Sequence, residues 1–199
     1  MKNFLLVSSK PWRDPLFERL NTRQEENWRR ISQRSEFTAE KLAEWNPDRV
    51  FIPHWSYIIP AEVFENYQCI VFHMTDLPYG RGGSPLQNLI VRGHQETKIS
   101  AIRVDEGIDT GKVYLKAPLS LLGTAQEIFH RSAEIIESMI KTIIDEDPEP
   151  EEQQGEPVNF KRRKPQDGDV SDLENLEEVF DYIRMLDCEG YPPAFLETD

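Results

Sequence analysis

The chain has 199 residues, of which 38% are hydrophobic and 30% charged, a balance typical of one or two globular domains with a buried core. Its formal net charge of −13 at pH 7 disfavours nucleic acid or an anionic membrane surface as a partner, because phosphates attract Lys and Arg. The two cysteines, Cys69 and Cys188, show no metal-binding spacing, so we expect reduced thiols and no metal site.

Targeting and membrane signals are missing from the pattern. The apolar run at residues 4–7 is too short for a signal peptide. No segment approaches the roughly 20 apolar residues of a membrane span. We therefore expect a cytoplasmic protein with no membrane partner.

Strand and helix patterns alternate in the first part of the chain. Short apolar runs predict strands at residues 4–7, 28–31, 49–53 and 69–72. Helical patterns predict helices at residues 14–20, 39–45 and 60–67. Such alternation favours parallel βαβ units, and so an α/β fold with a mostly parallel sheet and helices on both faces.

A loop begins the second part of the chain, and strands and helices follow it. Residues 77–85 read as that loop, followed by a helix at 85–92 and strands at 99–104 and 112–115. The long helix at 124–145 begins with a capping box of Thr124 and Glu127 and carries an apolar stripe of helical period. That stripe indicates core packing.

An acidic stretch divides this main part from the rest. Residues 145–157 are rich in Asp, Glu, Pro and Gln, which predicts a solvated linker or loop. A helix near residues 172–186 and an extended tail follow. We therefore expect a main domain at 1–147, an acidic linker or loop at 148–159, and a short helical C-terminal extension at 160–199 packed on the main domain.

One histidine and one aspartate stand where a ligand would lie in such a fold. His73 directly follows the apolar run at 69–72, and open α/β sheets bind ligands beyond the carboxyl ends of their strands. Asp109 lies in a turn between two later strands, so both side chains can reach one crevice. A carboxylate beside a histidine orients the ring and stabilises its cation, which suits proton transfer. Taken alone, a histidine at a strand end is more often structural.

Two motifs favour a catalytic over a structural role for His73. The run His73-Met74-Thr75-Asp76-Leu77-Pro78, followed by Arg81-Gly82 and Pro85, resembles the His-x-Ser-x-Leu-Pro-x-x-Arg-Gly-x-x-Pro segment of folate-dependent formyltransferases. Residues 105–111, which read Asp-Glu-Gly-Ile-Asp-Thr-Gly, resemble that family's Asp-x-Gly-x-Asp-Thr-Gly segment. The separation between the histidine and the aspartate is also the family's.

The resemblance implies a Rossmann-like fold, with the catalytic domain at 1–147, and a reaction. A formyl group would move from 10-formyltetrahydrofolate to an amine. His73 would transfer a proton at the tetrahedral intermediate, and Asp109 would orient His73 and shuttle the proton through water. Thr75 would take the place of the family's serine and keep its hydroxyl.

One position departs from the family pattern. The family has Asn two residues before its histidine, where the amide stabilises the developing oxyanion, and this chain has Val71 there. Valine donates no hydrogen bond, and loss of one such donor costs about a hundredfold to a thousandfold in rate. His54, Asn88 and a backbone N–H are possible replacements.

The resemblance also implies where the two substrates would bind. The folate pocket would be formed by His54, Trp55, Ser56, Tyr57, Ile58, Asp105, Glu106, Gly107 and Ile108. The acceptor would bind at Ser9, Lys10, Arg13, Arg81, Gly82, Gly83 and Ser84. Trp55 and Tyr57 read equally well as packing under a loop, and Lys10 and Arg13 as ordinary surface cations. The basic run at 161–164 could reach a phosphate, but such a run is more often a solvated strand or a partner for the acidic loop at 145–156.

Similarity at residues 72–90 and 160–195 is greatest to enzymes that act on nucleotide-linked 4-amino sugars. This implies a UDP-linked sugar of the pseudaminic acid type as the acceptor. No nucleic-acid partner is expected, since the chain lacks room for the basic C-terminal domain of the tRNA-acting enzymes. The alternatives are another amine, tRNA-linked or peptide, and an inactive folate-binding or nucleotide-binding module. The sequence does not decide between a monomer and a homodimer.

Overall fold

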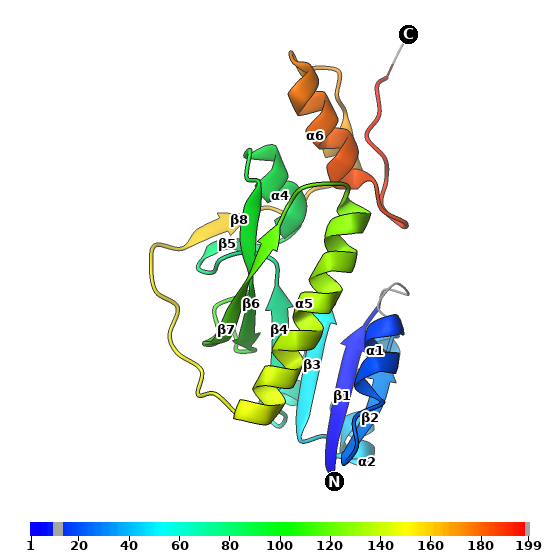
Figure 1. The fold of residues 1–199 in the computed structure, drawn as a ribbon, viewed down its shortest axis with the longest axis vertical. Helices are drawn as coiled ribbons and strands as arrows, with labels where there is room; N and C mark the ends of the chain where they lie inside the picture. The colour runs from blue at the N-terminus through cyan, green and yellow to red at the C-terminus, as the bar shows by residue number, and fades with distance from the viewer. Residues whose placement is uncertain (10–13, 198–199) are drawn as a thin grey trace.

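The computed structural model describes residues 1–9 and 14–197 (Figure 1). Its strands are β1 (Lys2–Ser8), β2 (Glu26–Ile31), β3 (Arg49–His54), β4 (Cys69–His73), β5 (Tyr79–Gly82), β6 (Glu96–Arg103), β7 (Val113–Ser120) and β8 (Val158–Phe160). Its α-helices are α1 (Asp14–Leu20), α2 (Ala39–Trp45), α3 (Ala61–Phe64), α4 (Pro85–Val91), α5 (Ala125–Glu146) and α6 (Leu176–Leu186).

The main sheet has six strands in the order β2-β1-β3-β4-β6-β7. Its first four strands are parallel, whereas β6 runs antiparallel to both β4 and β7. This confirms the predicted α/β fold with a mostly parallel sheet. The parallel strands end on one side of the sheet, which places the segments after β3 and β4 next to each other.

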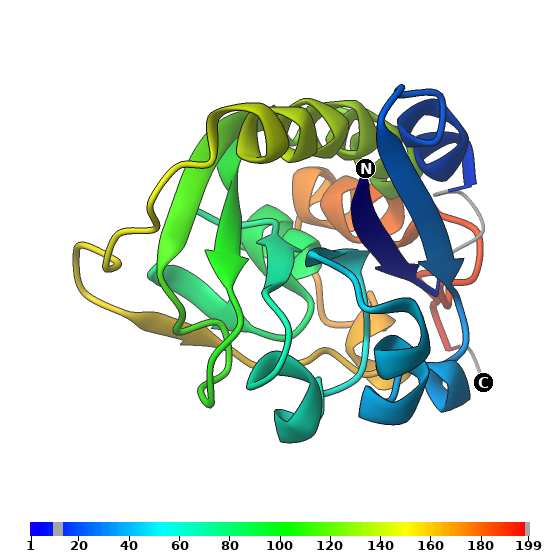
Figure 2. The same cartoon turned by 90° about the horizontal axis from the view of Figure 1, so that it is seen from below.

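Alternation along β1 explains the helices on both faces of the sheet. Phe4 and Leu6 belong to the core cluster that includes residues of α1 and α5. Leu5 and Val7 point the other way, into the cluster that includes residues of α2 and α3. Figure 2 shows α1 and α5 on one side of the sheet, and α2 and α3 on the other.

The long helix α5 has the predicted start. The Thr124 side chain accepts a hydrogen bond from the Glu127 N–H, and the Glu127 carboxylate accepts one from the Thr124 N–H. Its buried residues, among them Ile128, Ile136 and Ile140, lie on the sheet face that also holds Phe51 and Ile70. No helix in the described part of the chain is long and apolar enough to cross a membrane.

A second, small sheet was not predicted. Residues 77–85, predicted as a loop, contain β5, which pairs in parallel with β8 from the segment after α5. Gly82 has φ +104°, and a Cβ there would lie 2.4 Å from the carbonyl oxygen of Phe160. The strand pair therefore depends on glycine at this position, since it needs both the left-handed backbone and the close approach.

The C-terminal segment packs on the end of the main domain. Helix α6 begins at Leu176, later than predicted, because Asn175 caps it by accepting from the Glu178 N–H. The Gln87 side chain on α4 donates to the Met185 carbonyl on α6 over 3.2 Å. Figure 1 shows α6 beside α4 and the start of α5. The proposed linker at 148–159 ends inside β8, which begins at Val158.

Candidate active site

A cavity of about 840 Å³ lies where β3 and β4 end. One part of its wall is formed by residues 52–59, 71–74 and 102–111. The other part is formed by residues 82–87 and by the C-terminal segment, including Phe160, residues 162–165 and residues 190–192. Segments before and after α5 therefore enclose one space, which is large enough for a small-molecule ligand.

His73 is the last residue of β4 and is 7% exposed. Its Nε2 atom lies 2.7 Å from the carbonyl oxygen of Gly80. Because a carbonyl only accepts, this hydrogen bond places the proton of the neutral ring on Nε2. Nδ1 then keeps its lone pair, and it lies 3.5 Å from Oδ2 of Asp109.

Asp109 is held in place by its backbone and by its side chain. Its φ of +55° puts it in a tight turn between β6 and β7. Oδ2 accepts a hydrogen bond from the Gly82 N–H over 2.8 Å, so β5 aims the carboxylate. A proton gained at Nδ1 of His73 would face this carboxylate. The predicted pair thus has the geometry of a proton-transfer couple with one free base, Nδ1.

The loop from Asp105 to Gly111 is shaped by its own first residue. Oδ1 of Asp105 accepts from the Gly107 N–H over 3.1 Å and from the Thr110 hydroxyl over 2.6 Å. A Cβ at Gly107 would lie 2.0 Å from the Thr110 oxygen, so this turn excludes any larger residue. The loop therefore lines the cavity with a backbone that its own hydrogen bonds hold in place.

All nine predicted folate-pocket residues line the cavity. His54 to Ile58 and Asp105 to Ile108 all contribute to its wall. Trp55 also packs in the α2–α3 core cluster and makes edge contacts with Phe37 and Tyr57 at 5.6 and 5.3 Å between ring centroids. The packing interpretation of Trp55 and the pocket interpretation are thus compatible.

The predicted acceptor residues divide into three groups. Gly82, Gly83 and Ser84 line the cavity, whereas Ser9 and Arg81 are not among its wall residues. The Arg81 guanidinium instead binds the side chain of Gln153. Lys10 and Arg13 lie outside the described residues.

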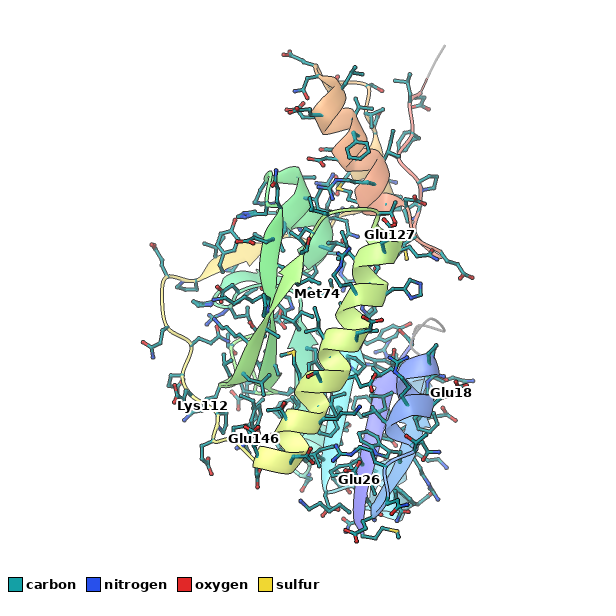
Figure 3. All side chains as sticks on the ribbon, viewed as in Figure 1. Glu18, Glu26, Met74, Lys112, Glu127 and Glu146 are labelled. Atoms are coloured by element: carbon teal, nitrogen blue, oxygen red, sulfur yellow. The ribbon has the colours of Figure 1, made fainter. Side chains whose placement is uncertain are left out.

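Thr75 lies behind His73 and does not line the cavity. Its hydroxyl donates to the Gly80 carbonyl over 3.4 Å, the same oxygen that Nε2 of His73 contacts. Met74, between them in sequence, is buried in the core cluster that α5 covers (Figure 3). In this geometry the hydroxyl supports the acceptor of His73 and lies away from the cavity.

The structure narrows the search for a substitute for the missing amide. Val71 lines the cavity and carries no polar hydrogen. Asn88 is not a wall residue, and its amide nitrogen donates to the carbonyls of Gly83, Ser84 and Lys161 at 2.8–3.1 Å. Asn88 is therefore occupied. Two candidate donors for the oxyanion remain. One is His54, which lines the cavity beside the Phe129 ring, and the other is a backbone N–H of the wall.

The sequence prediction missed Phe160 and Tyr191 as wall residues, and gave Arg162 only as part of a basic run that could reach a phosphate. Phe160, Arg162 and Tyr191 come from the segment after α5, and Tyr191 stacks on Phe129 with centroids 5.7 Å apart. The basic run at 161–164 was the visible signal, but its position depends on the β5–β8 pairing. Tyr191 carried no local signal at all.

Two groups that do not line the cavity have perturbed pKa values. Burial raises the pKa of the Cys69 thiol at the start of β4 to about 12, so it is no nucleophile at neutral pH. Burial also raises the pKa of Asp76, but hydrogen bonds and charges from Lys116 and Lys98 outweigh it and hold that pKa below its usual value. Asp76 does not line the cavity. In the described part of the chain no group of His, Cys, Asp or Glu could hold a metal ion.

Comparison with known proteins gives two family matches. The model described as "Formyl transferase" matches residues 16–138. The model described as "Methionyl-tRNA formyltransferase, C-terminal domain" matches residues 165–199. The two matches leave residues 1–15 and 139–164 outside them.

Curated relatives and solved structures agree with these matches. The methionyl-tRNA formyltransferase of Gluconobacter oxydans is 30% identical over 165 residues, which are 80% of this chain and 54% of that protein. The chain thus spans about half the length of the curated relatives it matches. A structure titled methionyl-tRNA formyltransferase from Clostridium thermocellum is 48% identical with a TM-score of 0.97, over 100% of this chain and 88% of that one.

More distant structures share the fold alone. HypX from Aquifex aeolicus, in complex with tetrahydrofolic acid, has a TM-score of 0.78 at 17% identity, over 98% of this chain and 36% of that one. A 4-N formyltransferase from Francisella tularensis has a TM-score of 0.75 at 15% identity, over 100% of this chain and 93% of that one.

Proposed function

The chain belongs to the formyl transferase family, and from this premise we propose that it moves a formyl group from 10-formyltetrahydrofolate to the amine of a second substrate. The observation that carries the proposal is the arrangement at the end of β4. There Gly80 fixes the proton on Nε2 of His73, and Nδ1 is left as a base beside Asp109 in a cavity.

The reaction needs one proton to move between two nitrogen atoms. The acceptor amine attacks the formyl carbon and becomes cationic in the tetrahedral intermediate. Nδ1 of His73 accepts the proton that this nitrogen releases, and Asp109 stabilises the resulting imidazolium. The proton then passes to N10 of the folate as its bond to the formyl carbon breaks. The products are the formamide and tetrahydrofolate.

The formyl donor fits the part of the cavity formed by residues 52–59 and 102–111. This proposal is supported by the rigid Asp105–Gly111 loop, whose fixed backbone can recognise a flat ring by hydrogen bonds. The folate complex of HypX, which shares the fold, is consistent with it. Gly82 to Ser84 and the C-terminal segment would then face the acceptor.

Methionyl-tRNA is the first candidate acceptor. The 48% identical structure and the curated relatives carry the name methionyl-tRNA formyltransferase. This is the tRNA-linked alternative that the sequence left open. It stands against the expectation of a sugar acceptor and no nucleic-acid partner.

A nucleotide-linked amino sugar is the second candidate, and two observations favour it. The chain carries a net charge of −13, which repels a long polyanion such as tRNA. Arg162, Arg163 and Lys164 nevertheless line one side of the cavity, where they suit a small phosphate-bearing molecule. The UDP carrier and the pseudaminic acid type stay predictions from sequence resemblance.

An acceptor panel tests the proposal. Purified protein is incubated with 10-formyltetrahydrofolate and either methionyl-tRNA, UDP-linked 4-amino sugars or no acceptor, and the release of tetrahydrofolate and the formylated amine are both measured. We expect transfer to one class and loss of that transfer in His73→Ala. Folate binding without transfer to any amine would instead identify an inactive binding module.

A further inference from the structure

The acidic segment at residues 148–159 is held against the Asp109 turn by hydrogen bonds of Gln153. It was expected to be solvated, and Glu152 and Gln154 are indeed exposed. Between them, however, Gln153 is partly buried and uses both ends of its amide. Nε2 donates to the carbonyl oxygens of Asp109 and Gly111 over 2.9 and 2.8 Å. Oε1 accepts from Nη2 and Nε of Arg81 over 2.7 and 3.2 Å.

The segment is also anchored on each side of Gln153. Glu151 exchanges two backbone hydrogen bonds with Val113 at the start of β7, over 2.7 and 2.9 Å. The Lys112 ammonium, labelled in Figure 3 beside this segment, lies 3.1 Å from the Glu152 carboxylate. Further on, the Val158 N–H donates to the carbonyl of Pro78 over 3.1 Å. The path of the chain thus fixes where the Gln153 side chain points.

These contacts link the Asp109 turn, β5 and Gln153 to one another. Gln153 holds the main chain of the Asp109 turn and the side chain of Arg81 on β5. The next residue of β5, Gly82, donates its N–H to the Asp109 side chain. The turn is therefore fixed to β5 through the Gln153 amide and through the Asp109 carboxylate itself.

We propose that Gln153 is a positioning residue for formyl transfer, which clamps the Asp109 turn onto β5 so that Oδ2 faces Nδ1 of His73. It touches neither substrate and acts through Asp109. An amide suits the site because two carbonyls need donors while the guanidinium needs an acceptor. A carboxylate would satisfy Arg81 but place negative charge against two carbonyl oxygens. This inference rests on the proposed function.

The test compares Gln153→Glu and Gln153→Met with Gln154→Glu and Gln154→Met. Gln154 is a matched control, since it is adjacent and exposed, and among the described residues its side chain bonds only to the Glu152 carbonyl, over 3.3 Å. Gln153→Met keeps the length of the side chain without its polar atoms. It is the variant to compare if Gln153→Glu does not fold. We expect both Gln153 variants to lose about tenfold to a hundredfold in kcat, with the KM values of folate and acceptor within threefold of wild type.

A double-mutant cycle with Asp109→Asn separates positioning from general damage. If Gln153 acts through Asp109, Gln153→Met costs little further kcat in the Asp109→Asn background. Losses that multiply, or Gln153 variants that match the Gln154 controls, would overturn the positioning role. Wild-type protein that formylates no amine in the panel would instead overturn the proposed function, so the two failures are distinguishable.

Discussion

Val71 and His73 project from the same face of β4 and line the same cavity, two residues apart. A side chain at Val71 therefore lies where an amide could reach an oxygen developing beside His73. Valine leaves that position without a donor. The site thus has a base at His73, but the Val71 side chain offers no hydrogen-bond donor to a developing oxyanion.

We predict that Val71→Asn raises kcat of formyl transfer about tenfold or more, because a positioned donor is worth about a hundredfold to a thousandfold elsewhere. Val71→Leu is the control, since leucine has nearly the shape of asparagine and no donor. Steady-state kinetics on the active acceptor compares the two. Equal rates for both variants would mean that His54 or a backbone N–H already serves the oxyanion.

His73→Ala should lower kcat about a hundredfold to ten-thousandfold, the usual contribution of a positioned acid–base group. Asp109→Asn should also lower kcat, because the amide carries no charge to stabilise the imidazolium. Its oxygen can still accept from the Gly82 N–H, so the turn should keep its geometry. Rapid-quench turnover measures both, and folate binding by fluorescence should be retained. Full activity in His73→Ala would contradict the mechanism.

Arg162→Ala should raise the acceptor KM about tenfold, because hydrogen bonds between charged groups contribute roughly 1.5–3 kcal/mol. The saturated kcat and the folate KM should stay near wild type. Lys161→Ala is the control, since Lys161 lies in the same basic run but is not a wall residue. An equal acceptor KM in the two variants would contradict the proposal that this segment binds the acceptor.

Glu137→Gln should destabilise the fold in a pH-dependent way. Burial raises the pKa of Glu137, but Lys141, 2.7 Å away, and Arg19 of α1 outweigh it and hold that pKa below its ordinary 4.5. A lowered carboxyl pKa stabilises the folded state above pH 4.5, and the contribution is lost as pH falls through the folded value. The side chains of Arg19 and Lys141 are 44% and 42% exposed, so solvent screens both ion pairs and we expect only about 1 kcal/mol at pH 7.

Urea unfolding at pH 7 and pH 3 measures this difference. The gap between wild type and Glu137→Gln should shrink at the acidic pH. Glu134→Gln, on an exposed position of the same helix, should show no gap at either pH. A gap of the same size at both values would mean that the ion pairs do not cause the stabilisation.

Local signals were sufficient for most of the fold. Thr124 and Glu127 mark the start of α5 within four residues, and the continuous apolar run from Phe4 to Val7 predicts a strand buried on both faces, as β1 is. His73 and Asp109 follow from where strands and turns end. The motif around them came from resemblance, because nothing in their spacing alone separates a catalytic histidine from a structural one.

The misses share a physical cause, which is pairing between distant segments. β5 holds two glycines in four residues and forms only against β8, far along the chain. Gln153 sits in a stretch whose composition reads as solvated, and its burial depends on Glu151 joining β7. Tyr191 reaches the cavity only after α6 docks. No window of sequence contains these partners together.

Helix α5 has a further consequence for how such an enzyme can change. Its 22 residues span about 33 Å and separate, in the chain, the segments that supply the proton chemistry from those that complete the far wall. Changes in residues 147–199, which follow α5, can therefore alter the acceptor side of the cavity while His73 and Asp109 stay in place. The proposed role of Gln153 predicts that such changes keep an amide at this position, because it donates to the carbonyls of Asp109 and Gly111.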